Sequence, residues 1–197
     1  MRHYGVVCLL IVTTGFTVLC VFVDRLPGDL YLTLFLQKVE SSWFSALMSW
    51  AIQLSHPLTM TIFASGIAGL LLIRRLKVEA LGLGIALLSG VISPFIKWTI
   101  GRPRPMEDLV IVRIVVEGHS FPSNHAFMSI LIFGMLWYLM PTLLGPRFWA
   151  IRILRTAIVF FVVYIGISRV YLGVHWPSDI VGGYILGLTI LCMIVRL

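Results

Sequence analysis

The feature that most constrains this chain is the regular alternation of long apolar runs with short polar stretches. Only 12% of its 197 residues are charged and 59% are hydrophobic, whereas a soluble domain carries about twice that charged fraction. A run of about twenty apolar residues is long enough to cross the hydrocarbon core of a bilayer as a helix. The pattern therefore predicts an all-α, polytopic membrane protein, with residues 1–197 forming one compact domain.

Six apolar runs have the length of transmembrane helices. They are expected at Tyr4–Val23, Pro57–Ile73, Val78–Ile96, Ser123–Met140, Ile153–Ile167 and Pro177–Val195. The first run resembles a signal peptide, but no small-x-small cleavage site follows it, so it is expected to remain as a helix. Pro141, followed by Gly145 and Pro146, is expected to close the fourth span. Gly183 and Gly187 give the sixth span a small-xxx-small face, which favours close packing against another helix.

The segment from residue 30 to residue 54 mixes apolar and polar residues. Trp43, Leu47, Trp50 and Leu54 recur in it at helical spacing. This spacing predicts one or two helices between the first two spans, lying in the membrane interface with their tryptophans at headgroup depth. An amphipathic helix packed on the bundle would show the same spacing, and the sequence does not distinguish the two.

Basic residues are unevenly divided between the two sides that six spans define. The side that carries both termini would hold Arg2, Arg74, Arg75, Lys77, Arg147, Arg152, Arg155 and Arg196, with Glu79 as its one acid. An excess of Lys and Arg marks the cytoplasmic side, so both termini are expected in the cytoplasm of a cell (inner) membrane protein. About half of the net charge of +7 is then explained by anionic headgroups. The remainder lies in three polar stretches, which all fall on the extracytoplasmic side.

The first of these stretches runs from Ser168 to Asp179 and lies between two strongly apolar segments. It contains Arg169, His175 and Asp179, and burying such side chains without partners near apolar depth costs several kcal/mol. A carboxylate that accepts from one ring nitrogen of a histidine fixes its tautomer and leaves the other lone pair free to attack. The stretch therefore indicates a reactive histidine, although a purely structural His–Asp pair has the same pattern.

The second stretch runs from Lys97 to Pro105. Arg102 and Arg104 are each followed by a proline, which stiffens the loop that carries them. Guanidinium groups on a stiff loop suit bidentate contact with phosphate oxygens, and Lys97 adds a point charge. The simpler explanation for Lys97 by itself is a lysine that snorkels to the interface.

The third stretch runs from Gly118 to His125. Ser123 is placed to cap the fourth span, which would leave first-turn N–H groups free to receive an anion. His125 would stand in the same turn. A capping serine beside an incidental histidine explains this stretch as well, and His119 and Ser120 read as ordinary loop residues.

The three polar stretches match a family pattern. Lys97-x6-Arg104-Pro105, Pro122-Ser123-x-His125 and Ser168-Arg169-x5-His175-x3-Asp179 are similar, in order, to the three signature motifs of the type 2 phosphatidic acid phosphatase superfamily. The resemblance covers about residues 90–190. One departure is Asn124, which stands where the family most often has glycine and adds a side chain at the pocket wall.

The resemblance implies a role for each matching residue. His175 would be the nucleophile that forms a phosphohistidine, Asp179 would orient it, and His125 would protonate the leaving oxygen and later activate water. Phosphate would be bound by Lys97, Arg104, Ser123, Arg169 and the backbone amide of Asn124. Arg102 lies outside the strict motif and is expected to be an additional phosphate contact.

The function implied is that of an integral membrane phosphatase acting on a lipid phosphate or diphosphate, similar to undecaprenyl diphosphate and phosphatidylglycerophosphate phosphatases. No cluster of residues has metal-ligand spacing, and the three cysteines lie in apolar runs, so neither a metal nor another cofactor is expected. Membrane lipids are the expected partners, and nucleic acid is not. A lipid phosphotransferase and a non-catalytic lipid-binding or transport protein remain alternatives, although both histidines and the aspartate are present.

Overall fold

The protein is all-helical over the residues described by the computed structural model, which are 2–145 and 147–196. Its helices are α1 (Arg2–Phe22), α2 (Asp29–Gln37), α3 (Ser42–Leu54), α4 (Pro57–Ile73), α5 (Lys77–Leu88), a 3-10 turn η1 (Ser89–Val91), α6 (Ile92–Ile100), α7 (Asn124–Leu144), α8 (Phe148–Tyr171) and α9 (Pro177–Ile194). The predicted all-α class is confirmed.

Five helical stretches are long and apolar enough to cross a membrane. They are Tyr4–Phe22, Lys77–Ile100, Asn124–Leu144, Phe148–Tyr171 and Pro177–Ile194. Helices α3 and α4 qualify together as a sixth, although they are bent by 53° at the break between them. The chain is therefore a multi-pass membrane protein, and its second span is the part that departs from a simple straight helix.

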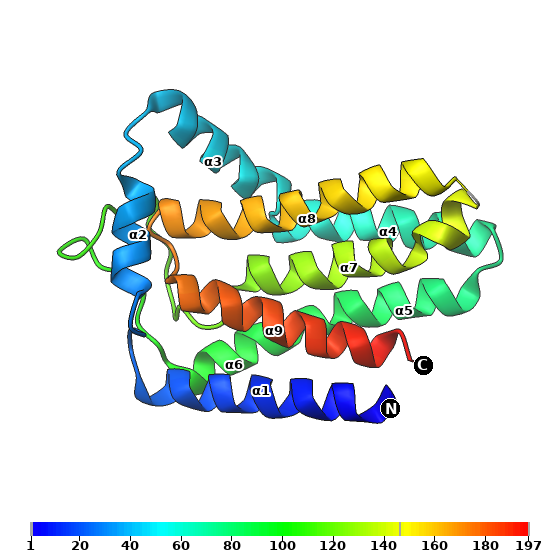
Figure 1. Cartoon of the computed structure of the whole chain (residues 1–197), viewed down its shortest axis with the longest axis horizontal. Helices are drawn as coiled ribbons and strands as arrows, with labels where there is room; N and C mark the ends of the chain where they lie inside the picture. The colour runs from blue at the N-terminus through cyan, green and yellow to red at the C-terminus, as the bar shows by residue number, and fades with distance from the viewer. Residues whose placement is uncertain (1, 146, 197) are drawn as a thin grey trace.

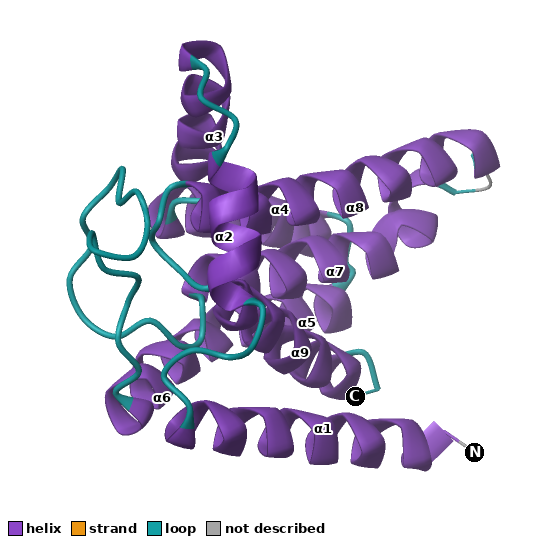
Figure 2. Ribbon diagram, turned by 60° about the vertical axis from the view of Figure 1, so that its left-hand side comes forward, coloured by secondary structure: helices purple, strands orange, loops and turns teal. Residues whose placement is uncertain are grey.

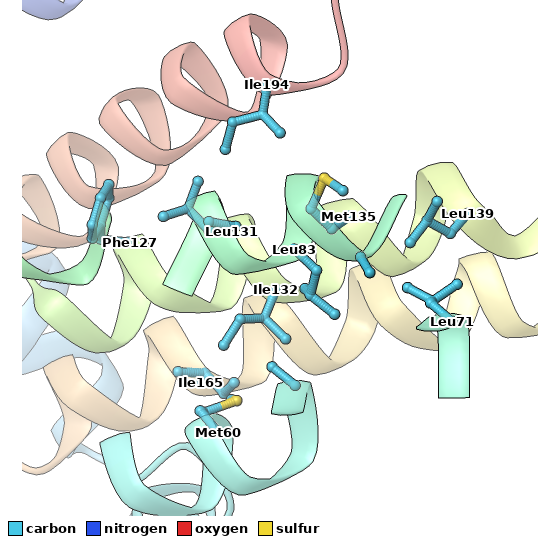
Figure 3. Close-up of a cluster of buried hydrophobic side chains, with 13 residues drawn as sticks. Met60, Leu71, Leu83, Phe127, Leu131, Ile132, Met135, Leu139, Ile165 and Ile194 are labelled. Carbon is cyan, nitrogen blue, oxygen red and sulfur yellow. The ribbon is translucent and has the colours of Figure 1, made fainter. Parts of the chain in front are cut away.

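Helix α7 is the centre of the bundle and packs against α4, α5, α8 and α9, while α1 lies at the periphery against α9 (Figure 1). One face of α7 supplies Phe127, Leu131, Ile132, Met135 and Leu139 to the buried apolar cluster (Figure 3). These side chains meet α4, α5, α8 and α9, so the core fixes the position of the helix whose first turn carries His125.

The expectation that Pro141 closes the fourth span is wrong, because α7 continues through it to Leu144. A proline inside a helix removes the hydrogen bond to the carbonyl four residues earlier, which here belongs to Trp137. That carbonyl instead accepts from Arg155 of α8, whose Nη2 and Nε lie 3.1 and 3.3 Å away. The helix thus continues because a neighbouring side chain replaces the lost donor. Gly145, the second residue of that prediction, does end the helix as its C-cap with a φ of 62°, and Pro146, the third, lies outside the described residues.

The close packing predicted for the sixth span is confirmed. A Cβ atom added at Gly183 of α9 would lie 2.7 Å from the Ser123 carbonyl oxygen, and one at Gly187 would lie 2.9 Å from the Phe127 carbonyl oxygen. Both distances are too short for a real side chain, so these glycines are what allows α9 to approach α7. The approach brings the start of α9 beside the start of α7.

Helix α2 lies across one end of the bundle (Figure 2) and turns a polar face inward. Asp29, Thr33 and Gln37 are its buried residues. Gln37 Nε2 donates to the carbonyls of Ile111 and Tyr171 at 2.7 and 3.0 Å. Helix α2 is therefore attached to the polar loop and to the end of α8 by hydrogen bonds.

Helix α3 packs against α8, where its Met48 joins Tyr171 and Leu172 in a buried apolar cluster. Trp43, Leu47, Trp50 and Leu54 are all exposed on α3, whereas Met48 and Ala51 are buried. The apolar stripe seen in the sequence therefore lies on the face of α3 turned away from α8, while the opposite face packs on the bundle; the position of this stripe at headgroup depth stays a prediction.

Candidate active site

The three polar stretches meet at one end of the bundle, opposite the end where the described chain begins and ends (Figure 1). The loop 101–123, the start of α7, the end of α8 and the start of α9 are all found there. Segments that are far apart in the sequence therefore supply one buried polar region.

The loop between α8 and α9 presents His175. Gly173 has a φ of 71°, and a Cβ atom there would collide with the Ile111 carbonyl, so only glycine suits this turn. Beyond it, the Val174 N–H donates to the Arg169 carbonyl at 3.1 Å. The chain thus folds back on the end of α8 and leaves His175 only 3% exposed.

Helix α9 begins immediately after His175 and places Asp179 beside it. Asp179 Oδ2 accepts from the Trp176 N–H at 2.8 Å, which caps the helix, and it lies 3.5 Å from His175 Nδ1. The pairing of His175 with Asp179 inferred from their spacing is therefore present in the geometry.

Ser120 connects the same two residues and was not predicted as a site residue. Its Oγ lies 3.3 Å from His175 Nδ1 and donates to Asp179 Oδ2. Ser120 is completely buried, although the sequence reads it as an ordinary loop residue. In the sequence, Ser120 lies three residues before Ser123, the predicted capping residue, and this closeness could have marked it as a site residue. The neighbouring sequence does not show which side chains Ser120 contacts.

Arg104 lies on the other side of the His175 ring. Its Nη1 is 3.4 Å from His175 Nε2 and 2.8 Å from the Val174 carbonyl, and its Nε donates to the Gly118 carbonyl. A guanidinium can only donate, so Nε2 carries a lone pair and the ring proton sits on Nδ1. The ring then donates through Nδ1 to Ser120, which in turn donates to Asp179.

The electrostatic environment keeps His175 neutral. Burial lowers the pKa of the His175 imidazole from its ordinary 6.5 to about 4, although the Asp179 carboxylate opposes the shift. Burial also lowers the pKa of the Arg104 guanidinium. A neutral His175 with its lone pair on Nε2 can act as a nucleophile at neutral pH once Arg104 Nη1 gives up its contact with that nitrogen.

Three cations converge on this region without acidic partners of their own. Lys97 Nζ donates to the carbonyls of His119 and Ser120 at 3.0 and 2.9 Å. Arg169, 2% exposed, donates from Nη2 to Ser55 Oγ at 3.1 Å, while its Nε is buried with no partner in the described structure. Among the described residues, no salt bridge joins Lys97, Arg104 or Arg169 to a carboxylate.

The start of α7 completes the site. Ser123 caps the helix by accepting from the Ala126 N–H, and its own N–H donates to the Asp179 carbonyl oxygen at 3.0 Å. His125 is half-buried in the first turn. Asn124 Oδ1 is buried there without a hydrogen-bond partner in the described structure.

Arg102 is placed differently from the other predicted site residues. Its guanidinium is completely buried and is bound by the carboxylates of Asp29 and Asp179 at 3.1 and 2.6 Å. It therefore lies behind Asp179 rather than among the three unpaired cations. Ser55 and Asp29, which contact Arg169 and Arg102, were also not predicted as site residues.

The described residues contain no group of three or more His, Cys, Asp or Glu side chains arranged to hold a metal ion. The arrangement instead offers an anion several fixed donors: two guanidinium groups, an ammonium group and a helix N-terminus, beside one nucleophilic nitrogen. These are the groups that stabilise a phosphoryl group during its transfer.

Comparison with known proteins places the chain in a family. Residues 77–197 match the model of the PAP2 superfamily. The chain belongs to this superfamily, which confirms the resemblance drawn from its three motifs.

Particular relatives are lipid phosphatases by name. The chain is 28% identical to a lipid A 1-phosphatase of Rhizobium etli over 66% of its own length and 59% of that protein. It is 33% identical to the putative undecaprenyl-diphosphatase YbjG of Escherichia coli over 49% of its length and 47% of that protein. The matched region thus spans less than two thirds of either relative.

Two solved structures share the fold. A transmembrane PAP2-type phosphatidylglycerolphosphate phosphatase of Bacillus subtilis superposes with a TM-score of 0.84 at 20% identity, covering 98% of this chain and 95% of that one. LpxE of Aquifex aeolicus superposes with a TM-score of 0.70 at 20% identity, covering 89% and 99%. At this identity the two comparisons establish the fold.

Proposed function

We propose that this PAP2 superfamily member is an integral membrane phosphatase that hydrolyses a lipid phosphate or diphosphate through a phosphohistidine. The observation that carries the proposal is the meeting of Lys97, Arg104 and Arg169, none paired with a carboxylate among the described residues, beside the Nε2 lone pair of His175. Arg169 is buried and Lys97 and Arg104 are half-buried; three cations gathered in this way repel each other, and a bound phosphate would relieve that repulsion. The names of the relatives support a lipid as the phosphate carrier.

In the first step of the proposed mechanism, Nε2 of His175 attacks phosphorus with its lone pair. The bond from phosphorus to the lipid oxygen breaks, and that oxygen takes a proton from His125. The Nδ1 proton of His175 stays in place, because the positive charge that develops on the ring is stabilised by Ser120 and Asp179. Lys97, Arg104, Arg169 and the first-turn N–H groups of α7 balance the charge on the phosphoryl oxygens.

In the second step, His125 takes a proton from water, and the resulting hydroxide attacks the phosphohistidine. The P–N bond breaks, inorganic phosphate leaves, and the lone pair returns to His175. A lipid monophosphate yields the lipid alcohol, and a diphosphate yields the lipid monophosphate. Undecaprenyl diphosphate and phosphatidylglycerophosphate are the substrate types that we propose, with residues 1–197 acting as a single phosphatase domain.

We place this reaction at the extracytoplasmic face. Arg74 and Lys77 lie where α4 ends and α5 begins, and Arg152 lies near the start of α8. These helix ends are at the opposite end of the bundle from the site (Figure 1), and an excess of such residues marks the cytoplasmic side. Single cysteines placed at 108 or 115, in a background without Cys8, Cys20 and Cys192, should react with an impermeant reagent on intact cells. A cysteine at position 77 should not react, and the reverse pattern would contradict this orientation.

The central test is phosphate release by the purified protein in detergent from a panel of lipid phosphates and diphosphates. Activity should persist in EDTA and should be inhibited by vanadate, whose trigonal-bipyramidal adduct resembles the transition state. A requirement for added Mg²⁺ or Zn²⁺ would contradict the metal-free mechanism. Transfer of labelled phosphate to a second lipid in place of water would identify a phosphotransferase, and the absence of both reactions would leave a lipid-binding protein.

A further inference from the structure

A second polar cluster lies directly behind the His175–Asp179 pair. It consists of Asp29 from α2, Arg102 from the polar loop, and Ser178 and Asp179 from the first turn of α9. All four are buried, and Arg102 is only 1% exposed. This cluster, called here the Asp29–Arg102 cluster, brings two carboxylates and one guanidinium into the interior of the protein.

The cluster is held together by direct hydrogen bonds. Arg102 Nη1 donates to Asp179 Oδ1 at 2.6 Å and to Ser178 Oγ at 2.9 Å, and Arg102 Nη2 donates to Asp29 Oδ2 at 3.1 Å. Asp29 also accepts from the Ser178 N–H at 2.9 Å and from Ser178 Oγ at 2.6 Å. Arg102 is therefore fixed from two sides, and Asp29 is one of the groups that fix it.

The two carboxylate oxygens of Asp179 have different hydrogen-bond partners. Oδ1 is bound by Arg102, whereas Oδ2 receives the Trp176 N–H and Ser120 Oγ and faces His175 Nδ1. A carboxylate held at both oxygens cannot rotate. The orientation of Asp179 toward His175 is therefore determined as much by Arg102 as by the helix cap.

We propose that Arg102 and Asp29 are positioning residues for the nucleophile. They hold the Asp179 carboxylate so that it keeps the His175 proton on Nδ1 and the lone pair of Nε2 directed at the phosphate. The inference rests on the proposed function, in which His175 attacks phosphorus. It extends the catalytic apparatus to α2, a helix that carries none of the three family motifs.

The alternative is that the cluster only stabilises the fold. The test must separate these two roles, because removing Arg102 alone leaves two buried carboxylates facing each other, which is strongly destabilising. Arg102→Met combined with Asp29→Asn removes one positive and one negative charge together. This double variant should therefore regain most of the stability that Arg102→Met loses, while Asp179 Oδ1 still lacks its partner.

The experiment compares wild type, Asp29→Asn, Arg102→Lys, Arg102→Met and the double variant in detergent. Four measurements are made on each variant. They are kcat and KM for a lipid phosphate, the inhibition constant of inorganic phosphate, the single-turnover burst of nitrophenolate from p-nitrophenyl phosphate, and the Tm. Arg113→Met and Asp24→Asn are matched controls. Arg113 is in the same loop and packs over Tyr171. The Asp24 side chain is exposed, and its main-chain carbonyl, which accepts from Arg102 Nε at 3.0 Å, is kept in Asp24→Asn.

Loss of the charged hydrogen bond to Asp179 should lower kcat at least tenfold in Arg102→Met and in the double variant. KM and the phosphate inhibition constant should stay within about threefold of wild type in both, because Lys97, Arg104 and Arg169 are unchanged. Arg102→Lys should have an intermediate kcat, Asp29→Asn a smaller loss, and both controls should resemble wild type. If Arg102→Met does not fold, Arg102→Lys and the double variant decide the outcome.

A double variant whose kcat recovers together with its Tm would overturn the inference and assign the cluster a purely structural role. Loss of phosphate affinity in proportion to kcat would also overturn it, because it would place Arg102 at the phosphate. A wild-type protein with neither phosphate release nor a burst would contradict the proposed function itself, and with it this inference. If the wild type releases phosphate and the kcat of Arg102→Met equals that of the wild type, this inference is contradicted and the proposed function is not.

Discussion

The two histidines of the site are presented by two regions that are built in different ways. His175, in the loop before α9, is almost fully buried and is contacted at both ring nitrogens, by Arg104 on one side and by Ser120 on the other. His125, in the first turn of α7, is half-buried, and no side-chain hydrogen bond reaches its ring among the described residues. One ring is held in a single orientation and the other is left free.

The difference matches the needs of the two proposed roles. A nucleophile requires one tautomer and one direction of attack, so fixing both ring nitrogens before the substrate binds favours the reaction. A proton donor must reach an oxygen whose position depends on the substrate, and its hydrogen bond often forms only in the complex. The comparison therefore supports the two roles that we propose, attack by the rigid region and proton transfer by the free region.

The largest predicted effect comes from removing each histidine in turn. His175→Ala should abolish reaction with both a lipid phosphate and p-nitrophenyl phosphate, because the covalent route is lost for every leaving group. His125→Ala should lose about 10²–10⁴-fold on the lipid but keep relatively more of the nitrophenolate burst, since nitrophenolate leaves without needing a proton. Single-turnover burst amplitude and rate are the measurements.

A burst in His175→Ala would require the two roles to be reassigned. The same conclusion would follow if His125→Ala lost the burst and lipid cleavage equally. Slow steady-state turnover of p-nitrophenyl phosphate by His125→Ala would not require a reassignment, because His125 is also the proposed base for hydrolysis of the phosphohistidine.

Ser120→Ala should weaken the rigid region without touching the phosphate. The change removes the hydroxyl that links His175 Nδ1 to Asp179, and a hydrogen bond to a charged group is worth about 1.5–3 kcal/mol. We expect kcat to fall about tenfold to more than a hundredfold, with little change in KM. Ser129→Ala, which removes a buried hydroxyl bonded only to the Ala126 carbonyl in the described structure, is the matched control.

Arg104→Lys tests the side of His175 that faces the substrate. An ammonium cannot reproduce the fork that contacts the Val174 and Gly118 carbonyls and the His175 ring together. We expect kcat/KM to fall about tenfold, through loss of roughly one charged hydrogen bond. Kinetics indistinguishable from wild type would show that a point charge is enough and that the fork has no role.

Asn124→Gly tests the free region. The side-chain oxygen of Asn124 is buried beside His125 without a partner among the described residues, and a substrate hydroxyl that donates to it would recover about 1–3 kcal/mol. Replacement by glycine should therefore lower kcat/KM for a glycerol-bearing substrate such as phosphatidylglycerophosphate relative to undecaprenyl diphosphate, by about tenfold. An unchanged ratio would mean that Asn124 does not select the headgroup.

The smallest predicted effect is the response of His175 to acid. Its pKa of about 4 keeps the ring neutral, with the proton on Nδ1, from neutral pH down to about pH 5. NMR of ¹⁵N-histidine-labelled protein, assigned with a His175→Gln variant, should show this. Because the ring protonates near 6.5 when unfolded, the stability it contributes is full above that pH and is lost as pH falls toward 4. Protonation near pH 6.5 in the folded protein would contradict the burial argument.

Much of the architecture was predictable because it depends on local properties. The length of an apolar run determines whether a helix can cross a bilayer, and a proline followed by an acidic residue marks a helix start, as at Pro177 and Asp179. The three motifs carried the family assignment, since their spacing is itself a property of the sequence. The continuation of α7 through Pro141 was not predictable, because the donor that replaces the lost hydrogen bond is supplied by α8.

The roles of two arginines two residues apart show what only the tertiary structure decided. In the sequence Arg102 and Arg104 are equivalent, each followed by a proline. In the fold, Arg102 is neutralised by Asp29 and Asp179, which are 73 and 77 residues away, while Arg104 has no carboxylate among the described residues and faces His175. The charge of a side chain is fixed by its chemistry, but whether that charge is available to a ligand depends on which distant groups the packing of α2 and α9 brings beside it.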